Sequence, residues 1–167
     1  MLVNAYSKKI FNLAYQFSGN YEAAEDLTQE IFLKLYGSLP KYDTSRNFTA
    51  WLLTISKNYL IDQYRKTKWE KTSRDEFDDR FLSAGKETGP EAEAIKSETQ
   101  KLVWKGFEFL SADIRMAVIL RDIQGKAYDE IAEIMSLPLG TVKSRVNRGR
   151  LQLAKVLKQI KEENHDM

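Results

Sequence analysis

The sequence has no cysteine and only one histidine, His165, close to its C-terminal end. The absence of cysteine excludes disulfide scaffolds, thiol nucleophiles, iron–sulfur clusters and cysteine-based zinc sites. A single histidine leaves no material for a serine–histidine–aspartate triad or a multi-histidine metal site. No apolar run reaches the roughly 18 to 20 residues of a membrane-spanning helix, and no signal peptide opens the chain. The composition argues against most enzymes and favours a binding protein, with no catalytic residue, metal or cofactor expected.

Charge is nearly balanced overall but unevenly distributed. The 167 residues carry 26 basic and 24 acidic side chains, a net charge of +2. The range 141–161 holds seven basic residues and no acidic one, whereas the range 22–30 holds four acidic residues and no basic one. Such segregation is typical of surfaces that bind partners of opposite charge, and nucleic acid is the natural partner of the basic run. Solvated helix faces are the alternative interpretation.

Apolar residues recur at helical spacing along most of the chain, and no alternating strand pattern of useful length occurs. In the N-terminal part, Gly19 is predicted to end a first helix and Asn20 to cap a second. Gly37 and Pro40 end that second helix, and a third begins after Asn47. A capping box at residues 97–100 opens the first helix of the C-terminal part.

The helical pattern is lost between these two parts, where opposite charges mix with glycine and proline. We therefore predict an all-α protein of two small helical domains, 1–66 and 97–161, joined by a flexible linker at 67–96, with a tail at 162–167. Such a linker has little with which to hold the domains together, so we expect no fixed arrangement of the two in the free chain. The alternative is that their partner-binding surfaces meet and hide the DNA-reading helix.

A helix-turn-helix pattern occupies residues 125–154. A short amphipathic helix is followed by a break at Ser136-Leu137-Pro138 and by a second, basic helix. The apolar face of the second helix consists of Leu139, Val142, Val146 and Leu153. Its opposite face is small, hydroxylated and basic, which suits a recognition helix because arginine reaches base edges and lysine and arginine bind phosphates. A basic helix that only packs on its neighbour is the alternative.

Two further surfaces are predicted in the N-terminal part. Leu33 and Tyr36 lie among acidic residues on the helix face opposite its apolar stripe, as in protein-binding surfaces. The alternative is that both pack under an adjacent helix. On the third helix, Trp51 begins a stripe of aromatic, amide and charged residues of the kind that binds single-stranded nucleic acid. Trp51 could instead belong to the core, and the stripe's Asp62 and Arg65 could form only an ion pair.

Three segments together resemble the extracytoplasmic-function (ECF) sigma factors of bacterial RNA polymerase, members of the sigma-70 family. They are DLTQEIFLKLY at 26–36, FTAWLLTISKNYLIDQYRK at 48–66 and YDEIAEIMSLPLGTVKSRVNRGR at 128–150. The resemblance covers nearly the whole chain, with the segments in the family's order and spacing. It implies a sigma-2-like domain at 1–66 and a sigma-4-like helix-turn-helix domain at 97–161.

The resemblance also implies the site residues. Binding of the polymerase core through the β′ clamp helices falls to Asp26, Gln29, Glu30, Leu33 and Tyr36. Recognition and melting of the −10 element, with a flipped base in a loop pocket, falls to Tyr42, Asp43, Arg46, Asn47, Phe48, Trp51, Asn58, Asp62, Arg65 and Lys66. Recognition of the duplex −35 element falls to Pro138, Gly140, Thr141, Lys143, Ser144, Arg145, Asn147 and Arg148.

The implied partners are the polymerase core (β′ clamp helices and β flap), promoter DNA and an anti-sigma factor, with no small-molecule substrate. The implied role is promoter-specific transcription initiation in a stress or envelope response. The implied location is the cytoplasm, or the membrane surface where an anti-sigma partner holds the factor there.

The sequence departs from the family pattern at three places. The first helix begins almost at the start of the chain, so we expect either a short first helix or a trimmed start. Ser111 follows Leu110 where relatives have proline, and serine can still cap the helix there. Gly149 stands inside the recognition helix, where glycine weakens a helix by up to ~1 kcal/mol.

A one-component regulator that binds duplex operators unaided is the rival interpretation of the helix-turn-helix. It gives no purpose to the acidic helix or to the stripe that begins at Trp51. A helical enzyme is a third possibility, but the sequence shows no nucleophile–base pair and no phosphate loop.

Overall fold

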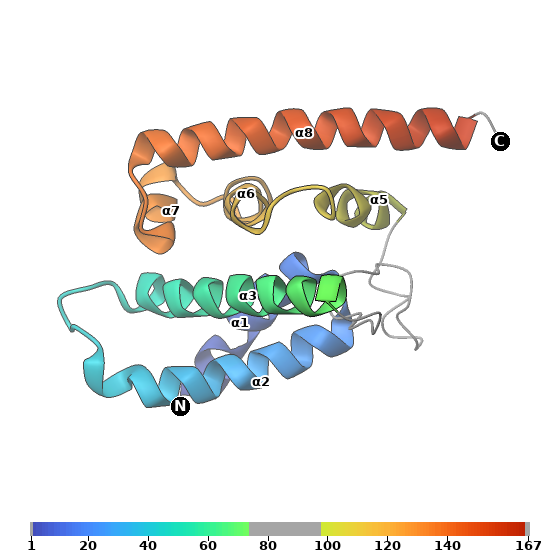
Figure 1. Ribbon diagram of the computed structural model, residues 1–167. Coiled ribbons are helices and arrows are strands. Elements are labelled where there is room, and N and C mark those ends of the chain that lie inside the picture. Colours follow the sequence, from blue (N-terminus) through green and yellow to red (C-terminus); the bar gives the residue numbers. More distant parts are fainter. Residues whose placement is uncertain (1, 74–97, 166–167) are drawn as a thin grey trace.

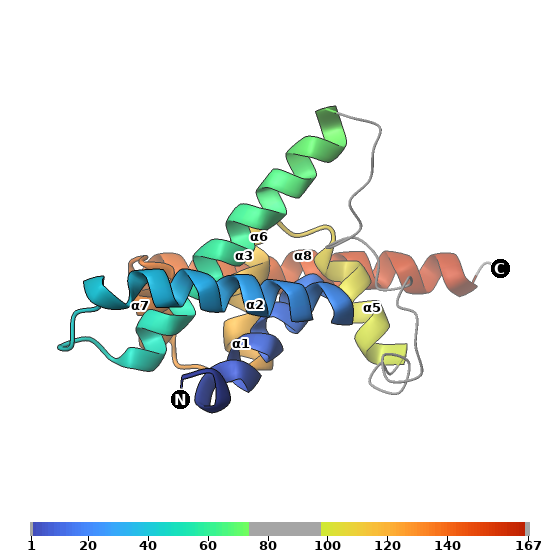
Figure 2. The same ribbon diagram turned by 90° about the horizontal axis from the view of Figure 1, so that it is seen from below.

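The computed structural model describes residues 2–73 and 98–165. Helices connected by short turns make up these ranges, and no β-strand occurs within them. Most of the predicted linker and the predicted cap Ser97 lie outside the described residues. Helix α3 nevertheless continues to Ser73, so residues 67–73, assigned above to the linker, are helical. Figure 2 shows this end of α3 projecting beyond the other helices.

The N-terminal unit consists of α1 (Leu2–Ser18), α2 (Tyr21–Ser38), the short 3-10 turn η1 (Leu39–Lys41) and α3 (Phe48–Ser73). Helix α1 has 17 residues, nearly as many as α2, so the expectation of a short first helix is wrong. The turn between α1 and α2 follows the prediction. Gly19 has a φ of +69°, which glycine adopts at no steric cost, and the Asn20 side chain accepts a hydrogen bond from the Ala23 N–H at 2.9 Å.

The C-terminal unit consists of α5 (Glu98–Phe107), α6 (Ala112–Val118), the π-helical turn η3 (Ile119–Ile123), α7 (Tyr128–Met135) and α8 (Leu139–His165). Ser111 caps α6 as expected, because its hydroxyl accepts from the Ile114 N–H at 3.4 Å. The predicted recognition helix of residues 138–150 is only the first half of α8, which also includes most of the predicted tail. The apolar face of α8 continues past residue 150 with Leu153, and this part of the helix packs against α5.

Gly149 has a packing role that the sequence did not reveal. Helix α8 crosses over α6 (Figure 1), and Gly149 lies buried at this crossing. A Cβ atom there would lie 2.4 Å from Val118 Cγ2 and 2.8 Å from Ile114 Cγ2, both far inside van der Waals contact. Glycine therefore permits the close approach of the two helices, and its low helix propensity accompanies that role.

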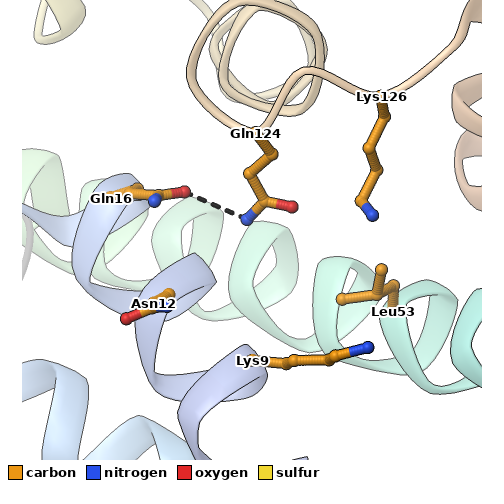
Figure 3. Close-up of a pocket in the computed structure, with 6 residues that line it drawn as sticks. All are labelled: Lys9, Asn12, Gln16, Leu53, Gln124 and Lys126. Carbon is orange, nitrogen blue, oxygen red and sulfur yellow. Dashed lines mark hydrogen bonds between the residues drawn. The ribbon is translucent and has the colours of Figure 1, made fainter.

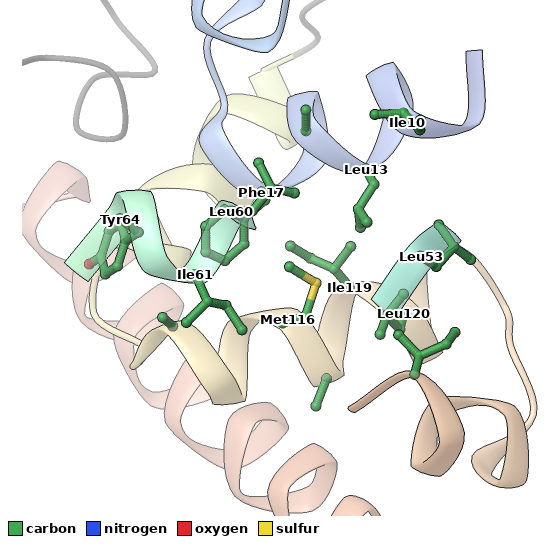
Figure 4. Close-up of a cluster of buried hydrophobic side chains, with 14 of the residues drawn as sticks. Ile10, Leu13, Phe17, Leu53, Leu60, Ile61, Tyr64, Met116, Ile119 and Leu120 are labelled. Carbon is green, nitrogen blue, oxygen red and sulfur yellow. The ribbon is translucent and has the colours of Figure 1, made fainter. Parts of the chain in front are cut away.

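The two units share one hydrophobic core. In Figure 1 the molecule is layered, with α8 on one side, α5, α6 and α7 in the middle, and α1, α2 and α3 on the other side. Figure 4 shows Leu13 and Leu60 of the N-terminal unit facing Met116 and Ile119 of the C-terminal unit. All four side chains are fully buried. The prediction of two domains without a fixed arrangement therefore differs from the structure, because α3 carries a second apolar face that packs on the other unit.

Polar contacts also join the units. The Trp104 indole N–H donates to the Gln16 carbonyl at 3.1 Å, and the Gln124 amide donates to the Gln16 side-chain oxygen at 3.0 Å. Arg115 of α6 is 2% exposed and donates to the Phe17 carbonyl at 3.2 Å. Its guanidinium lies 4.7 Å from the ring centroid of Tyr64. We call this packing of the two units against each other the closed arrangement. It is fixed by directional contacts as well as by apolar burial.

Candidate nucleic-acid and polymerase interfaces

The first half of α8 forms the surface predicted to read duplex DNA, which we call the helix-turn-helix surface. Val142 and Val146 are fully buried against the rest of the unit. The opposite face is exposed at Lys143, Ser144 and Arg148, and Figure 1 places this helix on the side remote from α1, α2 and α3. The closed arrangement therefore does not cover it. Its complete set of residues is Pro138, Gly140, Thr141, Lys143, Ser144, Arg145, Asn147 and Arg148.

The basic residues in the first half of α8 fall into two groups, those that form ion pairs and those that do not. Arg150 forms a two-pronged pair with Asp122, with N–O distances of 2.5 and 2.9 Å, and these hydrogen bonds raise the pKa of Arg150. Arg145 lies 3.9 Å from the Asp113 carboxylate. Lys143 and Arg148 form no ion pair with an acidic residue in the described part of the chain. Two cations of the helix-turn-helix surface are thus available to phosphates or base edges.

One residue of this helix lies differently from the prediction. Leu139, assigned to the apolar face, is 43% exposed because it is the first residue of α8 and lies before the helix reaches its neighbours.

The loop between η1 and α3 is a compact turn held by its own side chains. Asp43 accepts hydrogen bonds from the Ser45 N–H at 2.9 Å and from the Ser45 hydroxyl at 2.8 Å, and these bonds lower the pKa of Asp43. The Tyr42 hydroxyl donates to the Arg46 carbonyl. Asn47 caps α3 by accepting from the Ala50 N–H at 3.1 Å. Of this loop's predicted site residues, Asp43, Arg46 and Asn47 are exposed.

Aromatic side chains form the inner wall of this loop. The ring centroid of Trp51 lies 4.8 Å from that of Tyr42 and 5.5 Å from that of Phe48. Trp51 is only 7% exposed, so the alternative that it is a core residue describes its position. Tyr42 and Phe48 are half-buried in the same cluster. In this arrangement the cluster supports the loop, and only its two half-buried rings retain surface for a base to contact.

The outer face of α3 carries the remaining residues of the predicted −10 site. Four exposed residues follow one another along this face at intervals of about one helical turn or less: Asn58, Asp62, Arg65 and Lys66. Arg65 is not free, because it pairs with Asp113 of α6 at 2.5 Å. The ion pair of Arg65 therefore joins the two units, whereas the alternative interpretation had Arg65 pairing with Asp62.

A buried lysine beside this face was not found from the sequence. Lys57 is 7% exposed, and its ammonium group donates to the Asn58 side-chain oxygen. Burial lowers the pKa of Lys57. The Asn58 amide is therefore oriented with its nitrogen free to donate outward. No pattern in the sequence distinguishes this lysine from its exposed neighbours.

The acidic face of α2 is open, as the protein-binding interpretation requires. Leu33 is 74% exposed and Tyr36 is 48% exposed, so neither packs under a neighbouring helix. Asp26 and Gln29 are exposed beside them. The fifth predicted residue, Glu30, is half-buried and accepts a hydrogen bond from the Tyr59 hydroxyl of α3 at 2.5 Å. Glu30 therefore ties α2 to α3 as well as bordering this face.

Comparison with known proteins assigns the chain to a family. The family model for sigma-70 region 2 matches residues 2–70, and that for sigma-70 region 4 matches residues 108–153. The chain is 32% identical to the ECF RNA polymerase sigma factor SigW of Bacillus subtilis, over 95% of this chain and 88% of that one. It is 35% identical to the ECF RNA polymerase sigma-E factor of Escherichia coli K12, over 90% and 81%. The chain belongs to the ECF sigma factors.

A solved structure shares the arrangement of this ECF sigma factor. The sigma factor RpoE of Bartonella quintana, in complex with the anti-sigma factor NepR, aligns with a TM-score of 0.72 and 30% identity. The alignment covers 93% of this chain and 94% of that one, so both units superpose together. CnrH, in complex with the cytosolic domain of CnrY, shares the fold at a TM-score of 0.65 and 22% identity.

The family and the function as an RNA polymerase sigma factor, predicted from three segments, are confirmed, as is the all-α fold predicted from helical periodicity. The interpretation as a one-component regulator is not favoured. The match to sigma-70 region 2 accounts for residues 2–70, to which that interpretation assigns no function. The relatives are transcription factors of RNA polymerase rather than enzymes. None of the helices that the structure describes combines the length and apolar character needed to cross a lipid bilayer.

Proposed function

We propose that this ECF sigma factor directs core RNA polymerase to its promoters by reading DNA at two separate places and contributes no catalytic group of its own. It would act in the cytoplasm, where polymerase and promoter DNA meet. The observation that carries this proposal is the separation of two DNA-directed surfaces on different units, one basic helix face and one loop with an adjoining polar stripe.

The helix-turn-helix surface is suited to the duplex −35 element. Lys143 and Arg148 project from an exposed helix face without acidic partners among the described residues, so a phosphate or a guanine edge would find them available. Ser144, between them, is small enough for the backbone to approach the major groove. Arg–guanine pairs contribute about 1–3 kcal/mol of discrimination, so Arg148 is the main candidate for base recognition.

The loop between η1 and α3 and the outer face of α3 are suited to the single-stranded −10 element. The loop presents exposed Arg46 and Asn47 above the half-buried rings of Tyr42 and Phe48. An unstacked base could lie against those rings while the Asn58 amide, oriented by Lys57, donates to a base edge. Asp43, Trp51, Asp62, Arg65 and Lys66 complete the proposed site.

The exposed face of α2 is suited to the polymerase core. Leu33 and Tyr36 form an apolar centre, and Asp26 and Gln29 form a polar rim, the arrangement in which central residues supply most of the binding energy. Glu30 supports this face from the α3 side.

We further propose that the closed arrangement is the form held by an anti-sigma partner. The similar structure of the Bartonella quintana sigma factor is that of a complex with an anti-sigma factor. In the closed form Asp113 of α6 pairs with Arg65 at 2.5 Å, at the place where a DNA phosphate would compete for the same guanidinium. Promoter binding at the −10 site would therefore require Asp113 to withdraw.

Run-off transcription with core polymerase on a promoter library tests the main proposal. Arg148→Ala should reduce binding of duplex −35 DNA and change base preference at one position, whereas Asn58→Ala should leave −35 binding intact and reduce open-complex formation. Lys155→Ala, on α8 beyond the helix-turn-helix surface, is the matched control and should affect neither step. If Arg148→Ala and Asn58→Ala fail at the same step, the two-site assignment is wrong.

A further inference from the structure

A polar cavity of about 280 Å³ lies where the two units meet. It is lined by Lys9, Asn12 and Gln16 of α1, Leu53 of α3, and Gln124 and Lys126 from the end of η3 and the turn that follows (Figure 3). None of the promoter or polymerase residues assigned above lines it. The cavity is below the size of most pockets that enclose drug-sized molecules, so it has room for a small ion with water.

Apart from Leu53, the lining side chains are two lysines, which donate hydrogen bonds and carry positive charge, and three neutral amides. Figure 3 shows the ammonium groups of Lys9 and Lys126 entering the cavity from opposite sides, one from each unit. Among the described residues neither lysine forms an ion pair with a carboxylate. Glu130 and Glu133 line a separate, neighbouring cavity that shares Lys126 and Leu53 with this one. No acidic side chain lines the cavity itself.

Closing the units therefore brings two like charges to one space. An anion between the two ammonium groups would be attracted to both of them. The hydrogen bond from the Gln124 amide to the Gln16 side-chain oxygen, 3.0 Å long, joins two of the lining residues and leaves the Gln16 amide nitrogen able to donate. An anion would thus receive charge-assisted hydrogen bonds from both units at once.

We propose that this cavity binds a small multivalent anion of phosphate chemistry, and that the anion fastens the closed arrangement of the two units. The ligand is inorganic phosphate, pyrophosphate or the phosphate chain of a nucleotide. Because its donors come from both units, it binds the closed form better than the separated form and shifts the population toward closure. This inference rests on the closed arrangement and is independent of the proposed promoter contacts.

The test uses the full chain without polymerase or DNA. Since the sequence lacks cysteine, Glu25→Cys on α2 and Gln152→Cys on α8, both exposed, permit fluorescent labelling of each unit for distance measurement. Sodium phosphate, pyrophosphate and ADP are titrated separately, each against potassium chloride at equal ionic strength. In protein that carries no fluorophore, the side-chain amide resonances of Gln16 and Gln124 are followed by NMR. Binding is then detected even if the free chain is already closed.

We expect saturable shifts of both amide resonances and, where open molecules are present, an increase in the closed fraction. Lys9→Met and Lys126→Met should each weaken the apparent affinity at least tenfold, while Lys9→Arg should retain most of it. Lys8→Met, on the same helix but outside the cavity, is the matched control and should leave affinity unchanged. A response to pyrophosphate alone or to ADP alone would identify the source of the phosphate group.

Two results would overturn the proposal. One is a response no greater than that of chloride at equal ionic strength, and the other is an equal loss of affinity in the Lys8 control. Run-off transcription of the Lys9→Met variant separates this outcome from the promoter proposal, because loss of the anion site leaves promoter contacts in place.

Discussion

Replacing Gly149 by alanine should destabilise the protein, although alanine is the better helix former. In an exposed helix this change stabilises by about 0.8–1 kcal/mol. Here the new methyl would lie 2.4 Å from Val118 Cγ2 and 2.8 Å from Ile114 Cγ2. Both neighbours are β-branched, and Val118 is 2% exposed, so neither side chain can rotate away easily. Overpacking of this kind costs about 1–3 kcal/mol, which leaves a net destabilisation of up to about 2 kcal/mol.

The same helix provides the control. At Gly140 an added methyl would meet no atom within 4 Å, so Gly140→Ala should be neutral or stabilising by up to about 1 kcal/mol. Urea unfolding followed by circular dichroism at 222 nm compares the stability of both variants. In thermal unfolding, Gly149→Ala should lower the Tm of a chain of this size by up to about 8 °C. If Gly149→Ala unfolds at the same or a higher urea concentration than the unmodified chain, the close crossing of α6 and α8 does not determine stability as argued.

Three further predictions concern the surfaces. Combining Asp26→Lys with Leu33→Ala should weaken core polymerase binding at least tenfold with an unchanged helical spectrum, and equal affinity in a titrated pull-down would remove α2 from the interface. Asp113→Asn should increase the radius of gyration in small-angle scattering by freeing Arg65 of α3, more at low salt than at high salt, because exposed ion pairs are screened. Ser45→Ala removes one of two hydrogen bonds that lower the pKa of the Asp43 carboxyl, so an NMR titration should show that pKa rising toward its ordinary value of 3.8, and an unchanged pKa would contradict the turn geometry. Because the folded pKa is lowered, the turn's stabilisation is present above pH 3.8 and is lost as the pH falls through the folded value.

The helices and their caps were predictable because local residues determine them. The Asn20 cap and the Ser111 cap follow from side-chain oxygens that satisfy free N–H groups at helix starts. The exposed pair Leu33 and Tyr36 was predictable because apolar residues on a polar face of a helix are visible in its periodicity.

The contact between the units was not predictable in the same way. Helix α3 is apolar on two faces, and the helical spacing of its apolar residues does not show which neighbour each face meets. Leu60 and Ile61 belong to the second face, which meets α6 only through the tertiary fold. The buried position of Lys57 and the cavity at Lys126 likewise depend on which helices meet, and a single sequence does not encode that in any local pattern.

Arg115 gives the joint between the units a dependence on temperature. In the closed form its guanidinium is out of water, with the carbonyls of Phe17 and Phe107 and the hydroxyl of Tyr64 as its hydrogen-bond partners. Separating the units returns this cation to water, and hydration of an ion becomes less favourable as temperature rises. Hydrophobic burial across the joint also weakens on cooling. Both effects act in the same direction, so cooling should loosen the two halves and gentle warming, below the unfolding range, should draw them together.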